Sequence, residues 1–213
     1  NSDANSLYPS AMARLPGYLK GKPNVLTPEQ TSYAFLKQQS GYIVEVRVDK
    51  MGKWRDFPLQ SKAVKGVRDF SNRLECPKGK GYTLTMDNYS LEDFLKYHDA
   101  EVTILCGYYW NKGYNNRIND VIRYLYGCRL HYKVEGGKYW TIHTIKPILE
   151  HFNLSVAGIQ VLSMSKRIMN EVMCLAEDLE IPMYYQDTDS IHLDASRTEQ
   201  LTEAYEKAYS KEP

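Results

Sequence analysis

The sequence has no large excess of charge of either sign, which limits what it can attract through its overall field. It contains 27 Lys and Arg against 26 Asp and Glu, a formal net charge of +1 over 213 residues. A nucleic-acid-binding site would therefore have to arise from a local patch. The chain also lacks any run of about eighteen apolar residues, so no membrane-spanning helix is predicted.

Cysteine is scarce and its positions are scattered. The four cysteines form no close pair: Cys76, Cys106, Cys128 and Cys174. This spacing argues against a zinc site and is typical of a protein kept in a reducing compartment. No signal peptide opens the chain, so we expect an intracellular protein that is neither secreted nor bound to a membrane.

What the chain does contain is a mixture of strand-like and helix-like patterns. Alternating apolar residues predict strands at 41–50, at 101–110 and in a stretch that ends near Met86. A short helix is expected at 28–37, and Ser90 is predicted to cap the first of four longer helices: 90–100, 118–132, 155–179 and 197–211. Strands and helices mixed in this way, without strict alternation, are typical of an α+β fold.

One stretch, YYQDTDSIHL at 184–193, places two aspartates one residue apart in an apolar, aromatic run. If it is one continuous strand, Asp187 and Asp189 point to the same face, although neighbouring carboxylates repel each other and resist burial. Three interpretations are open. The first is a hairpin turn in which the aspartates cap backbone amides. The second is a calcium loop, for which the glycine and the distant glutamate are missing, and the third is a magnesium site for phosphoryl transfer.

The magnesium interpretation requires a further carboxylate, because two metal ions usually share one that comes from another strand. Asp3 is the candidate, since it precedes a tight turn and a helix that Pro9 can start. Backbone amides of such a turn, beside Ser6, and of a helix N-terminus bind phosphate. Cations held there would neutralise carboxylates that otherwise raise one another's pKa.

Two stretches carry a resemblance to a known family. DANSLYPSAM at 3–12 is similar to the first palm motif of family B DNA polymerases, Asp-x-x-Ser-Leu-Tyr-Pro-Ser, and YYQDTDSIHL is similar to their third, Tyr-x-Asp-Thr-Asp-Ser. The segment at 101–133 resembles the protein-primed branch found in phages, viruses and linear plasmids. The resemblance implies a palm-like antiparallel sheet backed by helices, with an insertion similar to the first terminal-protein region and a reduced or absent fingers subdomain.

On this resemblance the chain divides into four parts. They are the first palm motif with its following loop (1–39), the insertion (40–110), a helix with truncated fingers (111–153), and the long palm helix with the third motif (154–213). The family's second motif, Lys-x-x-x-Asn-Ser-x-Tyr-Gly, is missing, because none of the lysines in that interval is followed by Asn-Ser-x-Tyr-Gly: Lys133, Lys138 and Lys146. The motif's lysine normally neutralises charge on the triphosphate, so we expect weak or no activity from this chain alone.

The resemblance assigns the metal-binding and catalytic roles to three aspartates. Asp3 and Asp189 would bind two Mg²⁺ ions, for which Mn²⁺ can substitute. Asp187 would be an adjacent ligand or would support one. The backbone carbonyl of Ala4 would complete one coordination sphere.

The nucleotide and the DNA are assigned to a second group of residues. Ser6 and Leu7 would bind the triphosphate through backbone amides, and Tyr8 would lie under the sugar, where a 2′-hydroxyl would clash with the ring. Three residues would contact DNA: Ser165, Lys166 and Tyr185. Outside the motifs, Tyr8 would be interpreted as a core residue and Lys166 as a solvated charge.

The implied function is that of a DNA-directed DNA polymerase: template-directed deoxynucleotidyl transfer by two-metal-ion catalysis in protein-primed replication. Its partners would be primer-template DNA, deoxynucleoside triphosphates and, in one priming mode, a terminal protein, in the host cytoplasm or a plasmid or viral replication compartment. Two alternatives stay open. One is a catalytically incomplete palm fragment that acts as a binding or structural subunit, and the other is a metal-dependent nuclease.

Overall fold

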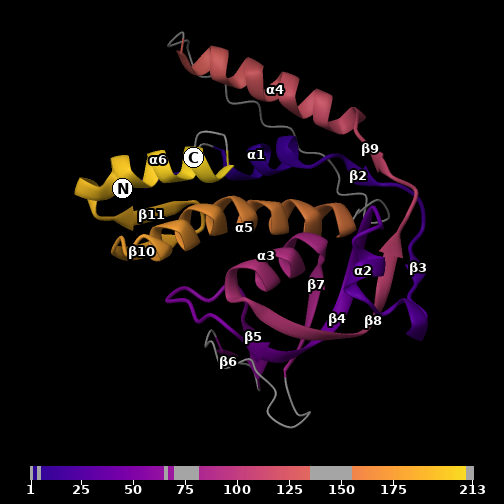
Figure 1. Ribbon diagram of the computed structural model, residues 1–213. Coiled ribbons are helices and arrows are strands. Elements are labelled where there is room, and N and C mark those ends of the chain that lie inside the picture. Colours follow the sequence, from indigo (N-terminus) through magenta and orange to yellow (C-terminus); the bar gives the residue numbers. More distant parts are fainter. Residues whose placement is uncertain (1, 4–5, 65–66, 70–81, 135–154, 210–213) are drawn as a thin grey trace.

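The computed structural model describes residues 2–3, 6–64, 67–69, 82–134 and 155–209. Its elements are antiparallel sheets and helices, so the fold is α+β as predicted (Figure 1). No helix within these ranges is long and apolar enough to cross a membrane.

The largest sheet has four antiparallel strands in the order β3-β8-β4-β7. Its long central strands are β4 (Gly41–Met51) and β8 (Ala100–Trp110), and its edges are β3 (Asn24–Val25) and β7 (Thr83–Asp87). Alternate residues of β4 are fully buried, as a strand with one face on the core requires: Val44, Val46 and Val48. The strands predicted for this region are confirmed.

Helix α3 (Asn88–His98) packs on this sheet, and the fully buried Phe94 lies in the core between them. Its N-cap is Asp87, whose carboxylate accepts a hydrogen bond from the Ser90 amide at 3.0 Å. The prediction that Ser90 is the N-cap is wrong, because Asp87 already has the extended backbone that an N-cap needs where β7 ends. The Ser90 hydroxyl instead donates to Ser163 at 3.1 Å.

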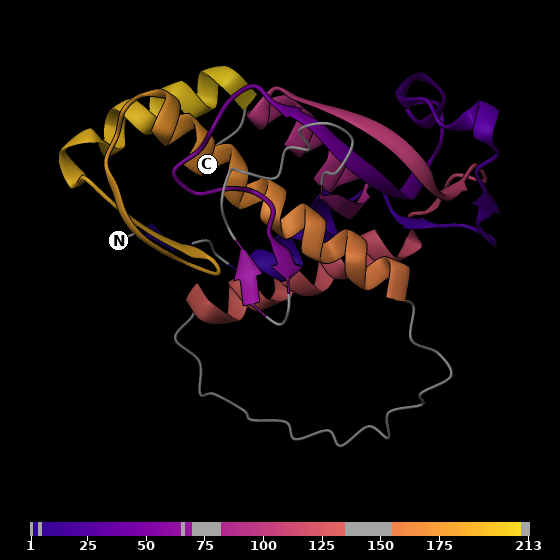
Figure 2. The same cartoon turned by 90° about the horizontal axis from the view of Figure 1, so that it is seen from below.

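Helix α5 (Ser155–Asp178) runs through the middle of the molecule (Figures 1 and 2). It contacts α3 on the side of the large sheet, and on its other side it contacts α1 (Leu7–Arg14) and α6 (Thr198–Tyr209). Helix α4 (Arg117–Val134) packs against α1, farther from the sheet. The three long helices predicted in the second half of the chain are confirmed.

Short elements fill the connections. They are β2 (Tyr18–Leu19), which pairs with β9 (Tyr114–Asn115), the 3₁₀ turns η1 (Pro28–Gln30) and η4 (Ala195–Arg197), helix α2 (Tyr33–Leu36), and the pair β5 (Lys62–Val64) and β6 (Val67–Asp69). The single helix expected at 28–37 is wrong in one respect. Ser32 interrupts it, because its hydroxyl accepts the Phe35 amide at 3.2 Å and starts α2 as a separate helix.

A separate three-stranded sheet has the order β1-β11-β10. The stretch 184–193 contains the hairpin turn that the sequence left open and is not one continuous strand, because β10 (Met183–Asp187) and β11 (Ser190–Leu193) pair antiparallel. Strand β1 (Ser2–Asp3) pairs with the other edge of β11. The start of the chain therefore lies beside a hairpin almost 190 residues away in sequence.

The sheet topology does not test the predicted division into four parts, since strands from different parts share sheets. β3 lies within 1–39, yet it hydrogen-bonds to β8 in the sheet formed by 40–110. Residue 39 therefore falls between strands of one sheet, and the four-part division stays a prediction.

Candidate active site

The hairpin brings together the backbones of the aspartates in the two motifs. Asp187 pairs with Ser190 on one side of β11, and Asp3 pairs with the same Ser190 on the other side. Neighbouring strands are about 4.8 Å apart, so the backbones of Asp3 and Asp187 are about 10 Å apart across the sheet. Asp189 lies in the turn that follows Asp187.

A small apolar cluster holds the two motifs in this arrangement. Leu7 of the first motif, Ile191 of the third and Met169 of α5 are all buried and pack together, at 5%, 4% and 7% exposure. Burying a side chain of this size stabilises the fold by roughly 1.5–3 kcal/mol relative to leaving it exposed. The cluster therefore ties the start of α1 and the strand of the hairpin to the same turn of α5.

Both motifs contain a residue in the left-handed backbone region. Ser6, which precedes α1, has φ +54°, and Thr188, the first turn residue of the hairpin, has φ +43°. A β-branched residue such as threonine rarely adopts positive φ, and residues held in such conformations cluster at functional sites. The turn at Ser6 also leads into the first amides of α1, which have no acceptor within the helix.

The carboxylates at the hairpin tip suit a hard cation such as Mg²⁺. Asp187 is exposed and Asp189 half-exposed, and neither carboxylate is neutralised by an ion pair within the described residues. Thr188 Oγ1 donates to Asp187 Oδ1 at 3.1 Å, and the Ser190 hydroxyl donates to the Asp187 carbonyl oxygen at 3.2 Å. Carboxylate oxygens on a short, hydrogen-bonded turn are the ligands that magnesium prefers.

These two carboxylates form a pair, not a complete metal centre. Among the described side chains, no three His, Cys, Asp or Glu residues are grouped closely enough to hold a metal ion. Only the backbone of Asp3 is described, and Ala4, the fourth expected ligand, lies outside the described residues. The four metal ligands named from the sequence therefore stay predictions.

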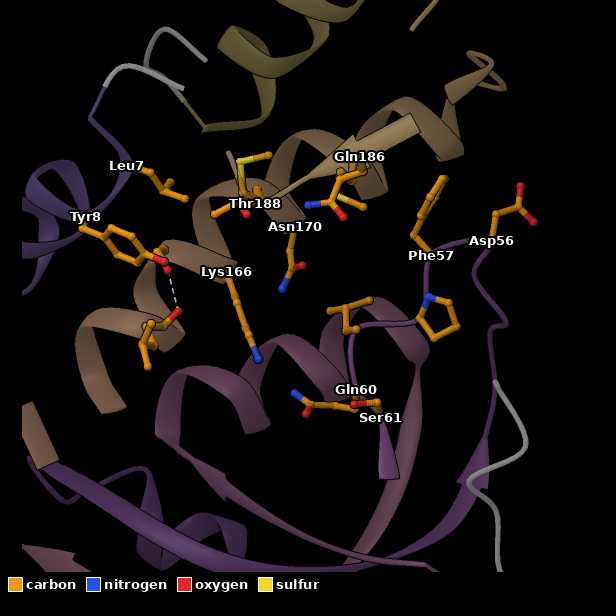
Figure 3. Close-up of a pocket in the computed structure, with 16 residues that line it drawn as sticks. Leu7, Tyr8, Asp56, Phe57, Gln60, Ser61, Lys166, Asn170, Gln186 and Thr188 are labelled. Carbon is orange, nitrogen blue, oxygen red and sulfur yellow. Dashed lines mark hydrogen bonds between the residues drawn. The ribbon is translucent and has the colours of Figure 1, made fainter. Parts of the chain in front are cut away.

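A cleft of about 660 Å³ opens beside the hairpin tip. Figure 3 shows residues of α1, α5, the hairpin and a loop around it, among them Tyr8, Lys166, Thr188 and Phe57. The volume is in the range of small-ligand sites. Residues that the sequence assigned to the nucleotide and to DNA thus line one cavity together with the hairpin turn.

Tyr8 is not a core residue, because 43% of it is exposed at the cleft. Tyr185 is also exposed, and its ring meets the His192 ring edge-on at a centroid distance of 5.4 Å. The two residues assigned to DNA on α5 differ. Lys166 is exposed and lines the cleft, whereas Ser165 is buried and its hydroxyl donates to the Leu162 carbonyl at 2.7 Å.

The next residue on α5, Arg167, serves the packing of the fold. Its guanidinium donates to Asp93 at 2.7 Å, to Glu92 at 3.0 Å and to the Tyr89 carbonyl at 2.8 Å, all on α3. Its side chain is only 17% exposed. Of the two adjacent bases Lys166 and Arg167, only Lys166 is therefore presented to the cleft.

No sequence pattern indicated the remaining wall of the cleft. This wall is the segment 56–61 between β4 and β5, which includes Phe57 and Gln60. Its residues match no family motif and follow no strand or helix period. Arginine is almost never fully buried without a partner, but the burial of Arg55 just before the segment is visible only in the structure, so no sequence signal marked the segment as fixed.

Two buried side chains hold this loop against the helices. Arg55, with a 3% exposed side chain, donates to the carbonyls of Tyr97 and Cys174 at 2.9 and 3.1 Å and to Asp178 at 2.7 Å. His98, 0% exposed, hydrogen-bonds through Nδ1 to the Lys53 carbonyl at 2.9 Å, and its Nε2 accepts the Leu59 amide at 3.3 Å. The second contact requires Nε2 without a proton, so His98 is neutral here.

The neutral state of His98 predicts a pH dependence of stability. Burial, together with the positive charge of Arg55, lowers the His98 pKa below its ordinary 6.5, although the hydrogen bond to Lys53 opposes this. As the pH falls below about 6.5, His98 therefore gains a proton in the unfolded chain but not yet in the folded chain, where its pKa is lower. The stability that His98 contributes is present above pH 6.5 and is lost as the pH falls, by about 1.4 kcal/mol per unit of pKa difference.

Denaturant unfolding at pH 7.5 and pH 5.5 measures this effect. The free energy of unfolding should fall more for the native protein than for His98→Gln, which has no titrating group at this position. Equal changes in the two proteins would show that His98 does not titrate differently on folding.

The fold is similar to part of phi29 DNA polymerase. An orthorhombic crystal form of that enzyme aligns with 91% of this chain at 20% sequence identity and a TM-score of 0.51. Phi29 DNA polymerase complexed with primer-template DNA aligns with 91% at 18% identity and a TM-score of 0.49. The chain spans only 38% and 37% of the lengths of those chains. No protein-family model matches the sequence, and neither does any curated protein.

At this identity the similarity to phi29 DNA polymerase shows the fold alone: an α+β arrangement that matches part of that enzyme. The segment in which the missing fingers motif was expected lies mostly outside the described residues, as do Lys138 and Lys146. Lys133 falls in α4, where only the backbone is described.

Proposed function

We propose that this chain is the palm region of a family B DNA polymerase of the protein-primed type, and that it takes part in template-directed deoxynucleotidyl transfer. The reaction is the attack of a primer 3′-hydroxyl, or of a priming protein's hydroxyl, on the α-phosphorus of a deoxynucleoside triphosphate. One P–O bond forms, the bond to pyrophosphate breaks, and the hydroxyl loses its proton.

The observation that carries the proposal is the register of the three-stranded sheet. Asp3 and Asp187 flank Ser190, and Asp189 follows in the turn, although the sequence separates the two motifs by most of the chain. Paired carboxylates that repel one another would be a cost to a protein with no use for them. The fold around this arrangement is similar to part of phi29 DNA polymerase, which supports the same assignment.

In this proposal the hairpin tip and the strand beside it would supply the metal ligands. Asp3, Asp187, Asp189 and the Ala4 carbonyl would be the ligands. The chemistry supplied by two Mg²⁺ ions, or by Mn²⁺ in their place, is activation of the attacking hydroxyl and neutralisation of charge on the leaving pyrophosphate. Thr188, which donates to Asp187 Oδ1, would fix the orientation of that carboxylate.

The remaining residues would bind and select the substrates. The amides of Ser6 and Leu7, at the start of α1, would bind the triphosphate. Tyr8, exposed at the cleft, would exclude a 2′-hydroxyl by its bulk and so favour deoxynucleotides. Lys166, also exposed at the cleft, would contact a phosphate of the primer-template, and the exposed Tyr185 would add a further DNA contact. Ser165, buried and hydrogen-bonded to the Leu162 carbonyl, would support the helix beneath them.

A primer-extension assay tests this function. The chain is incubated with a labelled primer on a longer template, deoxynucleotides and either Mg²⁺, Mn²⁺ or a chelator. Slow lengthening of the primer with either metal, and none with the chelator, is the expected result, since the sequence lacks the second motif and its lysine. Shortening of the primer would support a nuclease. No conversion, together with no metal-dependent binding of nucleotide, would contradict a catalytic palm and favour a binding subunit.

A further inference from the structure

The two sides of the cleft differ in chemistry. On one side α5 presents Lys166, which is the only basic residue among the described residues that line the cleft. On the other side the loop presents the apolar Phe57, Pro58 and Leu59, which lie between the carboxylate of Asp56 and the uncharged Gln60. Figure 3 shows Lys166 extending into the space that these loop residues border. A cation facing an aromatic and apolar wall suits a ligand with a phosphate on one side and a flat ring on the other.

We propose that the loop 56–61 is a nucleobase-binding wall, on which Phe57 stacks an unpaired base of single-stranded DNA while Lys166 faces its phosphate. This inference rests on the proposed function, because it names how that same cleft holds the strand. Phe57 is half-buried, so part of its ring remains available for contact. The cleft volume of about 660 Å³ suits one or two nucleotides, and the bases of a duplex are already stacked on one another.

A stacking wall works only if it is held in place before the ligand arrives, and His98 and Arg55 do this. His98 contacts both ends of the segment 53–59 through its two ring nitrogens, and it lies on α3, outside the cleft. Arg55 fixes the middle of the same segment to α5 through Asp178. We therefore assign His98 and Arg55 as positioning residues, which touch the loop and not the DNA.

The segment that leads into the loop contains a matched control. Trp54 is three residues before Phe57 and is 57% exposed, but it is not part of the cleft wall. A nonspecific loss of aromatic surface would affect binding equally at both positions. Only a base stacked inside the cleft would make the loss of binding larger for Phe57→Ala than for Trp54→Ala.

Binding of a fluorescently labelled oligo(dT) of about ten nucleotides tests the inference, at low salt and with a chelator present. We expect Phe57→Ala to weaken binding about tenfold or more, Trp54→Ala to leave it within about twofold, and Phe57→Trp to restore it. No binding by the native chain, no loss in Phe57→Ala, or an equal loss in Trp54→Ala would each overturn the inference.

A double-mutant cycle tests the positioning role of His98. His98→Phe keeps a ring of similar size but removes both hydrogen bonds to the loop. If His98 acts through the loop, Phe57→Ala should weaken binding much less in the His98→Phe background than in the native one. If the fold-losses in affinity of the two single variants simply multiply in the double variant, His98 does not act through the loop and is removed from the proposal. If His98→Phe does not fold, the Phe57 and Trp54 comparison still decides the main claim.

The binding assay separates this inference from the proposed function. It contains no metal ion and no nucleotide, so loss of primer extension with intact, Phe57-dependent oligonucleotide binding would contradict only the polymerase activity. Primer extension that survives in Phe57→Ala, with unchanged oligonucleotide binding, would contradict only the stacking wall.

Discussion

Replacing Asp189 by asparagine is expected to reduce metal-dependent primer extension by roughly a thousandfold or more. The substitution keeps the size and the hydrogen-bonding capacity of the side chain but removes the negative charge that a bridging metal ligand supplies. Asp189 lies at a half-exposed hairpin tip, so the free energy of unfolding should change by less than about 0.5 kcal/mol. The loss would therefore come from the chemistry and not from the fold.

Glu203→Gln is the matched control for this experiment. Glu203 is an exposed carboxylate on α6, away from the cleft, and its replacement removes the same charge. Extension should be unchanged in Glu203→Gln and lost in Asp189→Asn, with parallel loss of Mn²⁺ binding in the latter. Full activity in Asp189→Asn would show that this carboxylate binds no essential metal ion.

Replacing Glu171 by alanine is expected to cost about 3–5 kcal/mol of stability. Glu171 lies on α5 and is 5% exposed; both of its oxygens accept from Arg14 of α1, one of them at 2.8 Å, and Tyr205 of α6 donates to it at 3.0 Å. Its removal leaves the Arg14 guanidinium, whose side chain is 29% exposed, without this partner. It also loosens the contact among the three helices that support the candidate site.

Thermal or denaturant unfolding of three variants tests this prediction. Glu101→Ala breaks the exposed pair with Lys50, where both side chains are more than 60% exposed, and should cost no more than about 1 kcal/mol. The double variant Arg14→Met with Glu171→Met should recover much of the loss, because an apolar pair needs no charge compensation. A cost for Glu171→Ala no larger than that for Glu101→Ala would mean that the buried network does not support the fold.

Elements with long, strong periodicity were predictable from the sequence. The alternation in β4 and the helical spacing in α5 matched the structure to within a residue, because each long element buries one continuous face and the pattern of that face is local. The α+β class followed from the same patterns.

The sequence left a hairpin at the third motif open as one of three interpretations and could not decide in its favour, for a physical reason. An alternating pattern is the same whether the strand runs straight or folds back, and Asp-Thr-Asp lacks the glycine that usually marks a two-residue turn. Thr188 takes φ +43° in this turn although threonine disfavours that conformation, so the pairing of β10 with β11 and the burial of Ile191 three residues later must determine the local backbone.

The sequence by itself determined the long elements, the two motifs and the chemical type of the candidate site, because residue identity and spacing are local properties. Only the tertiary structure decided that Asp3 lies beside Ser190, and that a loop fixed by Arg55 and His98 forms the second wall of the cleft. These contacts join residues that are 39 to 187 positions apart. No local pattern encodes contacts between residues so far apart in sequence, since these contacts depend on which buried faces and buried charges pack together across the whole chain.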